Sequence, residues 1–191
     1  MVKAAIIGCG KIAQVRHIPE YLEHQAVNLV GFYDLNEKRA EELAEKYGGK
    51  AYGSVEELLA DPQIDAVSIC TANHTHAELT IKALKAGKHV LCEKPMAITL
   101  EECQRMVECA EENHRKLLIG QNQRLTRTHQ MARKLIADGE IGNVLSFQTS
   151  FQHSGPESWS VDAGKNTWFF QKKAAAMGVM GDLGIHKTDL I

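Results

Sequence analysis

The sequence predicts an α/β fold in which the first 121 residues form a doubly wound parallel sheet. Three observations support this prediction. Short apolar runs alternate with longer amphipathic stretches up to about residue 120, as expected when crossover helices separate the strands of a sheet. The apolar runs are mostly continuous, which is typical of parallel strands covered on both faces. A glycine-bearing turn joins the first run to the first amphipathic stretch, and right-handed crossovers then give the doubly wound order.

Local signals predict each element of this half in turn. The strands are expected where short apolar runs occur, at residues 2–8, 27–33, 65–71, 88–92 and 116–120. The helices are expected where the amphipathic stretches occur, at residues 11–22, 36–47, 54–61, 76–86 and 99–114. Asn36 is a good N-cap, and Ser54 with Glu57 has the form of a capping box. Gly48 and Gly87 follow helices at the position where a positive φ is common.

The character of the sequence changes after Gly120, and residues 122–191 are predicted to begin a second domain. A helix is expected at 128–137, and residues 143–152 alternate as a strand would. A loop bearing Trp and Phe follows at 153–170, and suits either a sugar-facing surface or packing between domains. Too few strands are present to close a core, so this α/β half is expected to be incomplete and finished elsewhere.

Composition excludes several classes of protein. The 22 basic and 24 acidic residues leave a net charge of −2, without the basic footprint of a nucleic-acid binder. No apolar run approaches the roughly 18 residues of a membrane helix. Five cysteines without a C-x-x-C pair argue against a disulfide framework, and a cytoplasmic location is expected. His74 and His76 lack the further ligands that a zinc site needs, so no metal is expected.

The turn after the first strand reads Gly8-Cys9-Gly10-Lys11-Ile12-Ala13, a G-x-G-x-x-A pattern that opens a helix. Gly8 permits the tight turn, and Gly10 lets the backbone approach a pyrophosphate. A helix N-terminus beginning at Lys11 and Ile12 supplies oriented N–H donors. The pattern predicts a dinucleotide site at this turn.

Asp34 ends the second strand, at about the 20-residue spacing expected for the acidic residue that binds the adenosine ribose. Its charge repels a 2′-phosphate, so NAD is the predicted cofactor. Lys38 and Arg39 lie close enough in sequence to bind that phosphate, and this leaves NADP open.

Glu93-Lys94-Pro95 directly follows the strand at 88–92. Ligands of an open parallel sheet lie beyond the carboxyl ends of its strands, so Lys94 is expected to face the reactive end of the cofactor. Its ammonium can stabilise charge on a substrate oxygen, and Glu93 can fix its position. Taken alone, such a tripeptide is equally well a surface turn.

Asp182-Leu-Gly-Ile-His186 is the second chemical candidate. If this segment is helical, Asp182 and His186 share one face at i, i+4. A histidine can accept the proton of a secondary alcohol as hydride leaves its carbon, and Asp182 can orient the substrate or the imidazole. Taken alone, the pair is more often a solvated or capping pair.

Together, the glycine turn, Glu93-Lys94-Pro95 and Asp182-x-x-x-His186 resemble the motifs of the Gfo/Idh/MocA oxidoreductases, which act largely on sugars, inositols and related polyols. Thr71-Ala-Asn73-His-Thr-His76 resembles the loop of that family that lies beside the cofactor. The resemblance implies a Rossmann domain at 1–121, followed at 122–191 by the start of a domain built on a mostly antiparallel sheet.

The resemblance also implies roles for individual residues. Lys94, Asp182 and His186 form the implied catalytic trio. The implied cofactor contacts are Gly8, Gly10, Lys11, Ile12, Asp34, Thr71, Asn73, His76, Glu93 and Lys94. The implied protein is a homodimer or homotetramer with a carbohydrate or polyol substrate and no nucleic-acid or membrane partner. Two alternatives are an NAD-dependent glycosidase or lyase with transient oxidation, and a non-enzymatic NAD-binding regulator.

Overall fold

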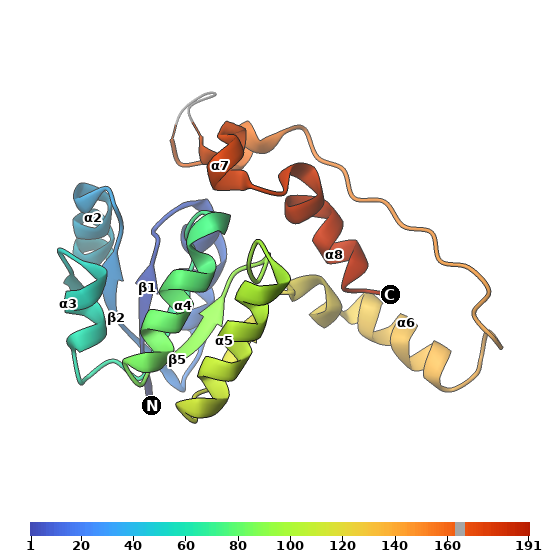
Figure 1. Ribbon diagram of the computed structural model, residues 1–191, viewed down its shortest axis with the longest axis horizontal. Helices are drawn as coiled ribbons and strands as arrows, with labels where there is room; N and C mark the ends of the chain where they lie inside the picture. Colours follow the sequence, from blue (N-terminus) through green and yellow to red (C-terminus); the bar gives the residue numbers. More distant parts are fainter. Residues whose placement is uncertain (163–166) are drawn as a thin grey trace.

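The computed structural model describes residues 1–162 and 167–191, and its central feature is a parallel sheet (Figure 1). Six strands lie in the order β3-β2-β1-β4-β5-β6, and every neighbouring pair is parallel. The strands are β1 (Val2–Ile7), β2 (Val27–Tyr33), β3 (Lys50–Ala51), β4 (Ala66–Ile69), β5 (His89–Cys92) and β6 (Leu117–Ile119). The order reverses between β1 and β4, which confirms the predicted doubly wound fold.

Helices cover both faces of the sheet. They are α1 (Ile18–Glu23), α2 (Glu37–Tyr47), α3 (Val55–Ala60), α4 (His76–Lys85) and α5 (Leu100–Glu112). Alternate residues of β1 serve the two sides: Ile7 packs in the cluster with α3, α4 and α5, and Ile6 packs in the cluster with α1 and α2. Each such fully buried side chain contributes about 1.5–3 kcal/mol, so the two apolar layers hold the carboxyl ends of the strands in fixed register.

Two of these helices begin at predicted caps, and a third begins at a cap that was not predicted. The Asn36 side chain accepts the Arg39 N–H at α2, and the Ser54 side chain accepts the Glu57 N–H at α3. Thr99 forms a complete capping box at α5. Two features differ from the expectation. The two-residue strand β3 is too short to show in the sequence pattern, and the first helix contains a π-helical turn at Ala13–His17.

The second half of the chain crosses the carboxyl end of the sheet. After α6 (Arg127–Ala137), the chain forms the short helices α7 (Lys172–Ala175) and α8 (Ile185–Thr188), with a π-helical turn at Met180–Gly184 between them. Figure 1 shows α7 above the sheet and α6 away from it. Part of the aromatic loop predicted at 153–170 lies outside the described residues, at 163–166.

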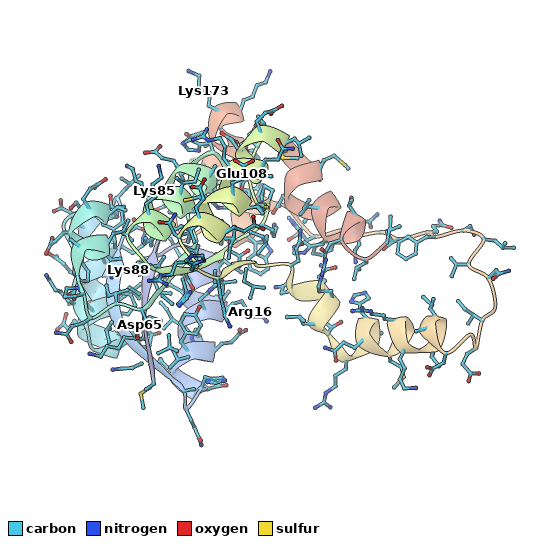
Figure 2. The ribbon with its side chains drawn as sticks, turned by 60° about the horizontal axis from the view of Figure 1, so that its bottom comes forward. Arg16, Asp65, Lys85, Lys88, Glu108 and Lys173 are labelled. Carbon is cyan, nitrogen blue, oxygen red and sulfur yellow. The ribbon has the colours of Figure 1, made fainter. Side chains whose placement is uncertain are left out.

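The strand predicted at 143–152 is wrong for this structure. These residues form no strand, and Figure 1 shows the trace after α6 running unpaired. Among the described residues, no strand lies beside it to complete its backbone hydrogen bonds, and alternation alone cannot hold a strand. Figure 2 shows α6 and this segment projecting from the rest of the molecule. Within the described ranges, no helix has the length and apolarity needed to cross a membrane.

Candidate active site

The glycine turn lies where β1 meets the first helix, against the end of β4. Gly8 has a φ of +93°, and a Cβ atom there would lie 2.7 Å from the carbonyl oxygen of Cys70. Gly10 differs, since an added Cβ would meet nothing within 4 Å. Lys11 and Ile12 follow, both partly exposed, at the start of the helix. The turn therefore combines one tightly packed glycine with one that faces open space.

Asp34 lies beside this turn, as its spacing predicts. One carboxylate oxygen accepts the Cys9 N–H at 2.7 Å, and the other accepts the Asn36 N–H at 2.8 Å. Arg39 Nη1 lies 3.3 Å from Asp34 Oδ1, and its Nη2 lies 2.5 Å from Asp162 Oδ1. A cation thus lies next to the carboxylate that was predicted to bind the adenosine ribose.

The loop after β4 is tied to the elements around it. The Asn73 side chain donates to the Ala175 carbonyl oxygen at 3.0 Å, which attaches α7 to the sheet. His76 lies 2.7 Å from the Pro95 carbonyl oxygen through Nδ1 and 3.1 Å from the Thr71 carbonyl oxygen through Nε2. Burial lowers the pKa of His76 despite these two bonds. Of the predicted cofactor contacts in this loop, Asn73 and His76 are buried and connect backbone segments.

Lys94 and Asp182 are brought together from positions far apart in the chain. Lys94 Nζ lies 2.8 Å from Asp182 Oδ1 and 2.7 Å from the Asp182 carbonyl oxygen. Both side chains are mostly buried. His153 approaches the other Asp182 oxygen, with Nε2 at 3.8 Å from Oδ2. Asp182 therefore pairs with the lysine of the Glu93-Lys94-Pro95 motif.

His186 lies on α8, beyond the π-helical turn that contains Asp182, and is 7% exposed. Burial, followed by the Lys94 charge, lowers its pKa below the ordinary 6.5. Its Nδ1 atom is buried without a hydrogen-bond partner among the described residues. The ring packs edge-on against Phe151, with centroids 5.7 Å apart. A neutral imidazole with an unused nitrogen is suited to accept a proton.

Sequence reasoning missed the partners of Glu93. His17 Nε2 lies 2.8 Å from Glu93 Oε1, and His17 Nδ1 lies 3.3 Å from Ser68 Oγ. Tyr21 then contacts the same Ser68 hydroxyl at 2.5 Å. Burial alone raises the pKa of Glu93, but the His17 bond and the Lys94 charge outweigh it and leave the pKa below its usual value. The sequence signal for His17 is weak, since it is one histidine inside a helical stretch.

The described residues hold no group of three or more His, Cys, Asp or Glu side chains placed as metal ligands. The chemistry available at this site comes from an ammonium, a carboxylate and an imidazole at the carboxyl end of β5. The glycine turn follows β1 and therefore lies at the same edge of this parallel sheet.

Comparison with known proteins finds dehydrogenases among the relatives of this chain. The chain is 35% identical to glucose-6-phosphate 3-dehydrogenase of Bacillus subtilis, over 100% of this chain and 53% of the relative. It is also 35% identical to myo-inositol 2-dehydrogenase of Thermotoga maritima, over 74% of this chain and 42% of that one. The chain spans about half the length of the curated relatives it matches.

A solved structure is similar as well. A 3-ketoreductase from Actinomadura kijaniata in complex with NADP superimposes with a TM-score of 0.69 at 27% identity, covering 72% of this chain and 42% of that chain.

Two family models match the chain. Residues 2–121 match the model described as an oxidoreductase family with an NAD-binding Rossmann fold. Residues 129–191 match the GFO/IDH/MocA C-terminal domain. The first match confirms the predicted class of cofactor, a nicotinamide dinucleotide. On the sheet order, the glycine turn and these two matches, the chain belongs to the Gfo/Idh/MocA family of oxidoreductases.

Proposed function

We propose that the protein is an NAD(P)-dependent dehydrogenase that oxidises a secondary hydroxyl group of a sugar, inositol or related polyol. The names of its relatives, a glucose-6-phosphate 3-dehydrogenase and a myo-inositol 2-dehydrogenase, support this substrate class. The observation that carries the proposal is the buried Lys94–Asp182 pair beside a histidine with a lowered pKa and a free ring nitrogen. A regulator that only binds NAD has no need of such a set.

The glycine turn fits a dinucleotide. The space next to Gly10 is open, which is what close approach of a pyrophosphate to the backbone requires. In this proposal Gly8, Gly10, Lys11 and Ile12 hold the pyrophosphate and Asp34 binds the adenosine ribose. Thr71, Glu93 and Lys94 lie at the nicotinamide end, and the buried Asn73 and His76 hold the loop behind them.

The protein groups in this proposal divide the handling of the proton. Bound at this site, the cofactor supplies the hydride acceptor. The Lys94 ammonium donates a hydrogen bond to the substrate oxygen and stabilises negative charge that develops there. His186, neutral at pH 7 because its pKa is lowered, accepts the hydroxyl proton. Asp182 fixes the ammonium by its two contacts.

Cofactor preference follows from the charges at the end of β2. Asp34 disfavours a 2′-phosphate, so NAD is the preferred cofactor in this proposal. Arg39, at 3.3 Å from Asp34 Oδ1, offsets part of that charge and can bind the phosphate. We therefore expect NADP to bind, with lower affinity than NAD.

The proposed organisation places a dinucleotide-binding domain at residues 1–121 and the start of a substrate and oligomerisation domain at 122–191. The contact between Asn73 and Ala175 supports a fixed arrangement of the two. We expect a cytoplasmic homodimer or homotetramer. Sedimentation of the full protein measures its oligomeric state directly.

Calorimetric titration with NAD and then NADP, followed by a screen of polyols and sugars for net cofactor reduction, tests the proposal. We expect NAD to bind more tightly and reduced cofactor to accumulate during turnover. A glycosidase or lyase that regenerates its cofactor would release product without that accumulation. A folded, monodisperse sample that binds neither nucleotide would exclude the dehydrogenase.

A further inference from the structure

A buried chain of polar side chains lies beneath Lys94 and has no place in the proton handling described above. It runs from Tyr21 through Ser68 and His17 to Glu93. We propose that His17 is a positioning residue for Lys94 and acts through Glu93. This inference rests on the proposed function, because Lys94 acts on substrate there.

The Glu93 carboxylate is held from three sides. Oε1 accepts from His17 Nε2 at 2.8 Å, and Oε2 accepts the backbone N–H of Lys94 at 3.2 Å. On the third side is Gly120, where an added Cβ would lie 3.1 Å from the carboxylate atoms. The carboxylate therefore has little freedom to move, and the lysine backbone is bonded directly to it.

The proton positions along the chain follow from the chemistry of its groups. An ionised carboxylate only accepts, so His17 Nε2 carries the proton that it donates to Glu93. In the neutral imidazole, Nδ1 then accepts from the Ser68 hydroxyl, and Ser68 accepts from Tyr21. Burial raises the pKa of Tyr21, which keeps the phenol protonated and able to donate. All three donors thus point toward Glu93.

The free-energy cost of burying these polar groups argues that His17 and Glu93 have a specific role. Both His17 and Glu93 are less than a tenth exposed, and burying a carboxylate costs free energy that apolar side chains of similar volume would not cost. His17 also lies on the π-helical turn that follows the glycine turn. The His17–Glu93 bond therefore connects the helix that follows the glycine turn to the residue that precedes Lys94.

Two substitutions of His17 distinguish a role in positioning Lys94 from a role in packing alone. The side-chain nitrogen of glutamine reaches the place of Nε2 and keeps the donor to Glu93, and the shorter asparagine reaches only the place of Nδ1. In the full chain we expect His17→Asn to lower kcat by about 10- to 100-fold, as small misplacements of reacting groups do, with KM and the NAD dissociation constant nearly unchanged. His17→Gln should restore most of kcat. Arg16→Gln, in the neighbouring exposed pair with Glu20, is the matched control and should behave as wild type.

A second readout does not depend on turnover. Amide hydrogen exchange at Lys94 reports the bond from its N–H to Glu93. We expect His17→Asn to speed this exchange by about tenfold or more, the effect of losing roughly 1.4 kcal/mol of local protection. The glutamine and Arg16 variants should keep the wild-type rate.

The two readouts keep the two proposals distinguishable. If no sugar or polyol is oxidised by the wild type, the proposed function fails, and the exchange rates alone decide the His17–Glu93–Lys94 link. If His17→Asn does not fold, Ser68→Ala replaces it. It removes the hydroxyl that bonds both His17 and Tyr21 but leaves the His17–Glu93 bond in place, and it should give the same effects at smaller size. Unchanged Lys94 exchange, or equal losses in the asparagine and glutamine variants, would overturn the inference.

Discussion

Gly8→Ala is the substitution for which the structure gives the most direct estimate of cost. The residue has a φ of +93°, and the new Cβ would lie 2.7 Å from the Cys70 carbonyl oxygen and 2.8 Å from Thr71 Cγ2. The carbonyl belongs to the backbone at the end of β4, so it cannot rotate away. The turn or the strand must shift to admit one methyl group.

Two contributions make up the expected loss of stability. A positive φ costs a residue with a Cβ roughly 1–2 kcal/mol. Forcing extra volume into a packed site costs a further 1–3 kcal/mol or so. Gly8→Ala should therefore lower the free energy of unfolding by about 2–5 kcal/mol, measured by urea denaturation followed by circular dichroism.

Gly10→Ala is the matched comparison within the same turn. Its Cβ meets nothing within 4 Å, so stability should change by no more than about 1 kcal/mol. The same methyl group would enter the space assigned to the pyrophosphate. NAD affinity should fall about tenfold or more, equivalent to roughly 1.4 kcal/mol by calorimetry.

The pair of results can fail in two separate ways. If the free energy of unfolding of Gly8→Ala lies within about 0.5 kcal/mol of the wild-type value, as for a neutral surface change, the close approach to Cys70 is wrong. If Gly10→Ala binds NAD as tightly as wild type does, the dinucleotide does not lie against this turn.

Three further predictions concern the chemistry of the site. Lys94→Ala should lower kcat by about 10²- to 10⁴-fold, the range for loss of a group that assists proton transfer. NAD binding should be largely retained, because Lys94 is only one of the residues proposed at the nicotinamide end; a calorimetric loss of most NAD binding would show that its main role is to hold the cofactor. Asp34→Ala should reduce the preference for NAD over NADP, because the charge that repels the 2′-phosphate is gone; an unchanged ratio of the two dissociation constants would refute that role. His186 has a pKa lowered by burial below 6.5, so its imidazole stays neutral as the pH falls to that value. Oxidation should therefore lose activity only under more acidic conditions, and a profile of kcat against pH with its acidic limb above 6.5 would contradict this.

Most of the first half of the molecule could be predicted because its signals are local. Apolar runs, caps and the glycine turn each depend on neighbours within a few residues. Burial on both faces of the sheet leaves a continuous apolar pattern that short-range reasoning can recognise. The two-residue strand β3 was missed because it is too short to have a period.

The remaining parts depend on contacts between distant residues. The alternation at 143–152 satisfies the local rule for a strand, but pairing needs a neighbour, and none lies beside it among the described residues. The His17–Glu93 bond joins positions on different elements, and nothing around His17 in the sequence marks it. The family resemblance places Lys94 and Asp182 in one site, but the contact between them was not predicted, since neither residue's surroundings point to the other.

That contact has a consequence for how the protein is made. The sheet is complete in sequence once β6 has been translated, at Ile119, and Asp182 follows roughly 60 residues later. At about 5–20 residues per second, the ribosome needs about 3–12 s to reach it. The nascent chain can therefore fold its sheet and expose its glycine turn to the nucleotides of the cell several seconds before Asp182 is available to pair with Lys94.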